Sequence, residues 1–348
     1  MKTKKHILFL TPGFPENEAD TTCIPAMQVF FKQLQDTQLI EISVISFQYP
    51  YQKDTYSWYG IKVYSTGGKN RKGLKRYLNW QKVFKLAGEI NKNKPISQLH
   101  SFWFSECAYV GNRIAKKIEI PHSCTFMGQD ALKENYYLKK IKKLPQVITL
   151  SKFHAATLKE SSGIVSDFVI PWGIEDMEQL PAVKKEVDIL GVGNLIPLKA
   201  FDRLIHVVKN VQLKIPDVKA EIIGDGHELE YLQRLIEENG LSENILVKGK
   251  LDRSAVLNRM GQSKCLLHLS QYESFGMVLI EAHSLGVKVF STNVGIAGEI
   301  EDISIINGDK DASQQILDFL KDNEFVSPPH NYSIKTTVDS YVENVFLM

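Results

Sequence analysis

The sequence predicts an α/β protein with two doubly wound parallel sheets, one in each half of the chain. Short apolar runs alternate with segments of helical periodicity in two successive series of similar size. Such β-α-β series are typical of parallel sheets that carry helices on both faces. The chain has 348 residues, which is also too long for one ordinary hydrophobic core. An acidic, aperiodic stretch with one proline, 175–186, is the expected linker.

The first series accounts for residues 1–174. Its apolar runs predict strands at 7–10, 40–47, 61–64, 97–103, 121–126, 147–150 and 168–170. Apolar residues at helical spacing predict helices at 24–34, within 69–94, at 106–117 and after Ser151, the expected N-cap. The turn-rich loop 11–15 follows the first strand, at the end of a parallel strand where ligands usually bind.

The second series accounts for residues 187–330. It predicts strands at 188–193, 220–223, 245–247, 265–269 and 287–290, and helices at 200–211, 227–238, 255–260, 277–285 and 313–320. The helix at 277–285 is expected to stop at Gly286. The last segment, 331–348, follows a Pro-Pro pair and is expected to form a helix, about 333–347, that packs back on the N-terminal domain.

Composition indicates a soluble globular protein, with 43% hydrophobic and 24% charged residues. No apolar run reaches the ~20 residues that a spanning helix needs, and 7–10 is too short for a signal-peptide core. Four cysteines, Cys23, Cys107, Cys124 and Cys265, show no metal-like spacing. They are expected to be reduced thiols of a cytoplasmic protein.

Charge is unevenly distributed along the chain. Residues 1–170 carry 25 Lys+Arg and 13 Asp+Glu, a net charge of +12, whereas the remainder has a net charge of −10. Within 69–94 there are nine basic residues and one acid, with apolar residues between them at helical spacing. One interpretation is a basic amphipathic helix on an anionic membrane surface. The alternative is a helix whose apolar face packs on the sheet and whose basic face is solvated.

The richest stretch for chemistry is 270–286. Glu273 lies in a predicted strand-to-helix loop, and Glu281 lies within the following helix. The N–H groups of Phe275 and Gly276 are expected at the helix N-terminus, which suits a phosphate or the hydroxyls of a polar ligand. The plainer alternative is that Glu273 caps the helix and Glu281 is solvated on its surface.

Motifs that are typical of other enzyme classes are weak or absent in this sequence. Gly191-x-Gly193 and Gly224-x-Gly226 each follow a predicted strand, but neither has the third glycine and acidic partner of a dinucleotide fingerprint. The sequence has no Gly-rich Lys-Ser/Thr loop, no His-Glu-x-x-His and no Gly-x-Ser-x-Gly. Hydrolase and nucleoside-triphosphatase functions therefore lack motif support.

Four segments of the second half occur in a telling order: Gly193-Asn194-Leu195-x-x-x-Lys199-Ala200-Phe201-Asp202, Ile222-Ile223-Gly224-Asp225-Gly226, Glu273-Ser-Phe-Gly-x-Val-x-x-Glu281 and Gly295-x-x-x-Glu299. Looser matches in the first half are Thr125-x-x-Gly128-x-Asp130 and 169–174. Together they resemble the retaining glycosyltransferases of family 4. That resemblance implies the GT-B fold, in which two Rossmann-like domains face a central cleft. It also implies that residues 1–174 bind the acceptor and 187–330 bind a nucleotide-sugar.

The resemblance assigns roles to particular residues. Lys199 would contact the donor diphosphate as a point charge. Glu273 would hold hydroxyls of the donor sugar, and Glu281 would accept hydrogen bonds from the ribose. Glu273 and Lys199 would be the catalytic pair. Further donor contacts are implied at Asn194, Gly226, Lys250, Ser274, Phe275, Gly276, Met277 and Val278. No cofactor and no metal are expected.

Two positions depart from the family pattern. Asn194 stands where the family often has Arg, and Met127 stands where it often has His. The second change leaves open whether His100 or His122 serves instead on the acceptor side, or whether the activity differs. The alternative for each of these histidines is a structural role. The acceptor side is expected to include Gly13, His100, Met127 and Asp130. The loops at 11–15 and 21–24 are further candidates for acceptor and donor contacts.

The sequence thus predicts a hexosyltransferase that moves a sugar from a UDP- or GDP-linked donor with retention of anomeric configuration. Its acceptor would be a glycan or a lipid-linked intermediate, and the basic first domain would suit the inner face of a cell membrane. No nucleic-acid partner is expected. Alternatives are an epimerase or a sugar-phosphate synthase on the same fold, or a catalytically silent protein that binds a sugar nucleotide.

Overall fold

The computed structural model describes residues 4–175, 184–322 and 332–347. The chain divides into two compact units. Unit 1 comprises Met1–Glu175 with Tyr332–Met348, and unit 2 comprises Asp176–Asn331. Most of the predicted linker, 176–183, lies outside the described residues.

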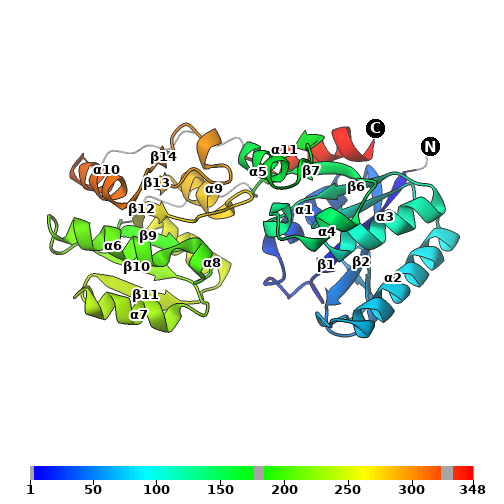
Figure 1. The fold of residues 1–348 in the computed structure, drawn as a ribbon, viewed down its shortest axis with the longest axis horizontal. Coiled ribbons are helices and arrows are strands. Elements are labelled where there is room, and N and C mark those ends of the chain that lie inside the picture. The colour runs from blue at the N-terminus through cyan, green and yellow to red at the C-terminus, as the bar shows by residue number, and fades with distance from the viewer. Residues whose placement is uncertain (1–3, 176–183, 323–331, 348) are drawn as a thin grey trace. The chain divides into compact units, whose positions relative to one another are not determined.

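Unit 1 contains an eight-stranded sheet with the order β3-β4-β2-β1-β5-β6-β7-β8 (Figure 1). The strands are β1 (Lys5–Gly13), β2 (Ile40–Tyr49), β3 (Asp54–Trp58), β4 (Ile61–Ser65), β5 (Gln98–Phe102), β6 (His122–Thr125), β7 (Gln146–Thr149) and β8 (Phe168–Val169). The helices are α1 (Pro25–Asp36), α2 (Leu74–Asn93), α3 (Glu106–Ile118), α4 (Tyr136–Lys140), α5 (Lys152–Ser162) and α11 (Ile334–Tyr341), which continues as the π-helical turn Val342–Phe346. All neighbouring strands are parallel except β3 and β4.

Two different cores cover the two faces of this sheet. On one face α2 and α3 bury aliphatic side chains such as Val83, Ala87 and Ile114 against β1, β2 and β5. On the other face, rings from α1, α11 and the strands form an aromatic core: Phe9, Phe30, Phe31, Phe102, Trp172, Tyr341 and Phe346. The C-terminal helix is therefore part of unit 1. Tyr341 Oη hydrogen-bonds Thr125 Oγ1 at 2.7 Å, and Gln98 Nε2 donates to Val345 O at 2.9 Å.

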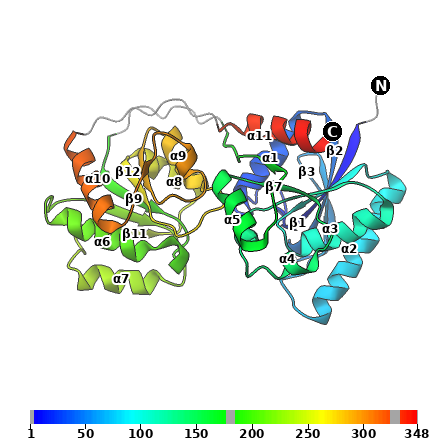
Figure 2. The same cartoon turned by 45° about the horizontal axis from the view of Figure 1, so that its top comes forward.

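Unit 2 contains a six-stranded, all-parallel sheet with the order β11-β10-β9-β12-β13-β14. Its strands are β9 (Val187–Val192), β10 (Ala220–Ile223), β11 (Ile245–Gly249), β12 (Ser263–His268), β13 (Lys288–Ser291) and β14 (Ser304–Ile305). Its helices are α6 (Phe201–Gln212), α7 (Leu229–Glu238), α8 (Arg253–Gly261), α9 (Met277–Ser284) and α10 (Asp309–Asp322). Helices α6, α7 and α10 pack on one face, and α8 and α9 contact the sheet from the other (Figures 1 and 2).

These two sheets confirm the predicted α/β class with two Rossmann-like domains. Three of these helices and strands were not predicted: the short helix α4, the two-residue strand β14 and the antiparallel strand β3, which pairs with β4 through the tight turn Tyr59-Gly60. The first residues of β3 are exposed and polar, so it gives no apolar run. Helix α10 begins at Asp309 rather than 313, because acidic residues of its first turn suit the positive end of a helix. Across the described residues, no helix is both long and apolar enough to cross a membrane.

Candidate functional site

The loop between β12 and α9 is held in one conformation by its neighbours. Gly276, with φ of 90°, is the N-cap of α9, a conformation that L side chains rarely adopt. Ile296 N donates to Phe275 O at 2.8 Å, and a Cβ on Gly295 would lie only 2.2 Å from that same oxygen. Thr292 Oγ1 donates to Ser270 O at 2.6 Å. The 295–299 loop therefore supports the loop that carries Glu273.

Glu273 stands between two basic side chains. Lys199, from the 3₁₀ turn Pro197–Lys199, donates to Glu273 Oε1 through Nζ, and His268 Nε2 donates to the same oxygen at 3.0 Å. All three side chains are largely buried, with exposures of 20% for Lys199, 14% for Glu273 and 5% for His268. The structure thus brings together the predicted pair Lys199 and Glu273, which are 74 positions apart in the chain.

The environment of Glu273 keeps it ionised. Burial raises the pKa of this carboxyl group, but the hydrogen bond and charge of His268 and the charge of Lys199 outweigh burial, and the pKa falls from 4.5 to about 2. A group with this pKa does not donate a proton at neutral pH. Glu273 is suited instead to accept hydrogen bonds from hydroxyl groups.

Glu281 lies further along α9 and is 9% exposed. Arg253, at the start of α8, donates to its Oε1 at 2.5 Å. Burial raises the pKa of Glu281, and the charge of Arg253 opposes that rise. The alternative of a solvated surface carboxylate at this position is wrong, because the side chain is buried and paired.

A pocket of about 370 Å³ opens at the C-terminal ends of β9 and β10, and its lining includes Asn194 and Lys250. One position of its lining, 224, requires glycine, since a Cβ on Gly224 would lie 1.8 Å from Gly193 O. Gly226 packs closely on the chain at Leu195, since a Cβ at this position would lie 2.2 Å from Leu195 O. Val192 lines this pocket and also the small cavity beside Lys199 and His268, so the two groups of residues adjoin.

The remaining donor-side residues predicted from the sequence lie in or next to the first turn of α9. Ser274, Phe275 and Gly276 are buried, and Met277 and Val278 are half-buried. Apart from Glu281, which lies further along α9, the predicted donor-binding residues therefore follow the C-terminal ends of β9, β10, β11 and β12. This is the edge at which parallel α/β sheets usually bind ligands.

The predicted acceptor-side residues lie in unit 1. Gly13 ends β1, and Met127 and Asp130 follow β6. Asp130 accepts hydrogen bonds from the N–H groups of Phe104 at 2.7 Å and Gly128 at 2.7 Å, so it organises this loop. Burial raises the pKa of Asp130 despite these bonds.

His100 belongs to the core. It has no exposed surface, its Nδ1 lies 2.8 Å from Ser123 Oγ, and its Nε2 lies 3.2 Å from Thr125 Oγ1. Burial holds its pKa well below 6.5. His122 bonds Ser101 Oγ through Nε2 at 2.9 Å. In this structure His100 has no surface with which to contact an acceptor, which favours the structural alternative for this residue.

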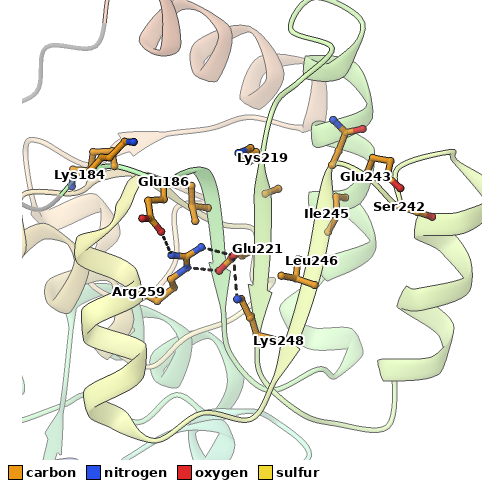
Figure 3. Close-up of a pocket in the computed structure, with 14 residues that line it drawn as sticks. Lys184, Glu186, Lys219, Glu221, Ser242, Glu243, Ile245, Leu246, Lys248 and Arg259 are labelled. Carbon is orange, nitrogen blue, oxygen red and sulfur yellow. Dashed lines mark hydrogen bonds and ion pairs between the residues drawn. The ribbon is translucent and has the colours of Figure 1, made fainter.

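A larger pocket, of about 580 Å³, lies at the opposite edge of the unit 2 sheet (Figure 3). Arg259 forms a bidentate pair with Glu221, with hydrogen bonds from Nε to Oε2 at 2.7 Å and from Nη2 to Oε1 at 2.6 Å. It also donates to Glu186 at 2.8 Å, and Lys248 lies 3.6 Å from Glu221. The charged groups at the centre of this pocket therefore neutralise one another.

Two residues of the site were missed from the sequence, His268 and Arg253. His268 interrupts the apolar run 265–269, five residues before Glu273, and a histidine near the C-terminal end of a buried strand is a usable signal. Arg253 gave no signal, because its pairing with Glu281 depends on how α8 packs beside α9.

Parts of this chain are similar to known sequences. Residues 174–335 match the family model of glycosyl transferases group 1. An uncharacterized glycosyltransferase of Methanocaldococcus jannaschii is 26% identical over 269 residues, which cover 74% of each chain. N-acetyl-alpha-D-glucosaminyl L-malate synthase of Bacillus anthracis is 31% identical over 132 residues, 36% of this chain and 33% of that protein. One human subunit of phosphatidylinositol N-acetylglucosaminyltransferase is 30% identical over 135 residues, 38% of this chain and 28% of that protein.

Solved structures resemble the chain over nearly its whole length. TarM superposes with a TM-score of 0.75 at 14% identity, covering 100% of this chain and 99% of that one. Sucrose-phosphate synthase of Thermosynechococcus elongatus gives 0.73 at 15% identity, covering 99% and 95%. Anabaena HepE, solved with UDP and glucose, gives 0.67 at 16% identity, covering 98% and 95%. Residues 174–335 are therefore similar to the glycosyl transferases group 1 family, in a chain that has the GT-B fold.

Proposed function

We propose that the protein is a retaining hexosyltransferase of family 4, which transfers a sugar from a nucleotide diphosphate-sugar to a hydroxyl group of its acceptor. The observation that carries this proposal is the arrangement around Glu273. An ionised carboxylate, a lysine and the N-terminus of α9 meet at the edge of a domain that matches the glycosyl transferases group 1 family.

Each part of this edge has a task in the proposed reaction. The first turn of α9 directs N–H groups and a partial positive charge toward the donor diphosphate. Lys199 stabilises the negative charge that grows on the leaving phosphate. Glu273 accepts hydrogen bonds from the sugar hydroxyls, and Glu281 accepts them from the ribose. In a retaining transfer the acceptor oxygen forms its bond on the face that the phosphate leaves, and that phosphate takes the acceptor proton.

The first donor to test is UDP-N-acetylglucosamine. Several similar proteins are named N-acetylglucosaminyl transferases, and their named acceptors include phosphatidylinositol and poly(ribitol-phosphate). For this chain we propose a glycan or lipid-linked acceptor. The pocket lined by Asn194 and Lys250 would hold the nucleotide base.

We further propose that unit 1 works at the anionic inner face of a membrane. Helix α2 packs Val83, Ala87 and Ile90 on the sheet, as the alternative to membrane docking expects. Its first turns nevertheless leave Leu74 73% exposed and Leu78 51% exposed among basic residues. Co-sedimentation with anionic vesicles should be strong at low salt and weak at high salt, since surface charges are screened. Equal binding to neutral vesicles would contradict the proposal that basic residues of unit 1 attract it to an anionic membrane.

The test of the transferase proposal is a donor screen. The protein is incubated with UDP- and GDP-sugars, released nucleotide is measured, and the product anomer is assigned by NMR. Glu273→Ala should lower turnover at least about a hundredfold, by the size typical of groups that stabilise a transition state. Glu243→Ala, at the opposite edge of the sheet, is the matched control and should retain activity. Conversion of a donor to its epimer, or binding without turnover, would replace the proposal with one of its alternatives.

A further inference from the structure

We propose that His268 is a positioning residue: it keeps Glu273 aligned with the donor sugar when Lys199 turns to the diphosphate. This inference rests on the proposed function and adds a residue to it. It starts from the observation that Lys199 and His268 both donate to the same carboxylate oxygen, Glu273 Oε1.

The two partners of that oxygen differ in rigidity. His268 is the last residue of β12, in register with Ser291 of β13, and Thr292 N donates to its backbone oxygen at 3.1 Å. Its ring is only 5% exposed and has two side-chain torsions. Lys199 lies in a short 3₁₀ turn, is 20% exposed and has a flexible four-carbon chain. Lys199 can therefore swing toward a new anion, whereas His268 is fixed by the strand.

A bound diphosphate would compete with Glu273 for Lys199, because it carries more negative charge than one carboxylate. Glu273 would then keep a single donor, the Nε2–H of His268. An ionised carboxylate can only accept hydrogen bonds, so Nε2 carries the hydrogen in this pair. Without that donor, the buried carboxylate would be unpaired at the moment when it must hold the sugar.

The second carboxylate oxygen completes the arrangement. Within the part of the chain that the structure describes, both hydrogen bonds to the Glu273 carboxylate end on Oε1, and Oε2 accepts none. Because His268 holds Oε1 by a hydrogen bond, the orientation of the carboxylate is fixed. Oε2 can then accept a hydrogen bond from a sugar hydroxyl in one direction. The effect of His268 is therefore expected on the sugar part of the donor and not on its nucleotide part.

The test compares two probes, UDP and UDP-N-acetylglucosamine, by calorimetric titration of the full chain. His268→Leu should weaken binding of UDP-N-acetylglucosamine about tenfold, the size of one hydrogen bond to a charged group, and leave UDP binding within about twofold. His268→Gln places an amide donor near the position of Nε2 and should recover much of the loss. His206→Leu, an exposed histidine of α6, is the matched control. A melting curve without ligand checks that each variant is folded.

The outcomes separate the two proposals. If the wild-type chain binds neither probe, the proposed function fails and the role of His268 fails with it. If the wild type binds both but His268→Leu weakens them equally, or not at all, only the role of His268 is wrong. Failure of His268→Gln to recover sugar-dependent affinity would also contradict it, because a folded amide variant retains the donor.

Discussion

Two buried glutamates at opposite edges of the unit 2 sheet differ in how much of their hydrogen-bonding capacity is used. Glu221, near the start of β10, has both oxygens bonded by the rigid fork of Arg259 and lies near Lys248 (Figure 3). Glu273, just after β12, has both partners on one oxygen. Arg259 of the fully bonded pair, Glu221–Arg259, also bonds Glu186 and so connects that residue to α8. Glu273 instead keeps one carboxylate oxygen that can accept a hydrogen bond from a ligand.

Helix direction reinforces this difference. The loops that line the pocket around Glu221 follow the C-termini of α6 and α7, where partial negative charge favours lysine and arginine. Glu273 instead precedes the N-terminus of α9, which favours anions. The larger pocket is therefore the less suited of the two to a diphosphate, although it is richer in basic residues.

The largest expected effect is on stability, at the fully bonded pair. Arg259→Leu leaves the carboxylate of Glu221 buried with most of its partners gone, and should lower the free energy of unfolding by about 3–5 kcal/mol. Urea melts measure this loss. The double variant Arg259→Leu, Glu221→Leu should recover most of it, because no buried charge is then left unpaired. A double variant as unstable as the single one would refute this explanation.

A smaller effect of the opposite kind is expected at Glu281. Burial raises the pKa of this carboxyl group, which means that the folded protein disfavours its ionised form. Glu281→Gln removes that charge and should therefore melt at or above the wild-type temperature. The same variant should bind UDP about tenfold more weakly, since an amide is a poorer acceptor for the ribose hydroxyls. Thermal melts and UDP titrations measure the two effects. A variant that is less stable and still binds UDP normally would show that Glu281 is structural.

A further effect is the pH dependence of stability at Glu273. Its pKa is lowered from 4.5 in the unfolded chain to about 2 in the folded one. The stability that ionised Glu273 contributes is therefore complete above about pH 4.5 and is lost as the pH falls toward 2. The difference in unfolding free energy between wild type and Glu273→Gln should shrink across this range. A constant difference from pH 6 to pH 2.5 would mean that Glu273 is not held ionised.

The sequence predicted the sheets well because buried parallel strands are continuous apolar runs. The resemblance of its motifs to glycosyltransferases of family 4 also predicts that Lys199 and Glu273 act together. The sequence did not separate core from site in unit 1, where strands covered on both faces show no alternation of polarity. His100 is expected at the acceptor side because Met127 stands where the family often has His, but in the structure it lies among aromatic rings. The pairings of His268 and Arg253 depend on tertiary contacts that no local pattern reports.

The measurement that tests the central claim most directly is a UDP titration of three proteins: the wild type, Lys199→Ala and Lys248→Ala. Each variant removes one lysine beside a buried glutamate, at opposite edges of the same sheet. UDP should bind the wild type, bind Lys199→Ala at least about tenfold more weakly, and bind Lys248→Ala as the wild type does. UDP binding that survives in Lys199→Ala and is lost in Lys248→Ala would place the nucleotide at the other edge and contradict the account.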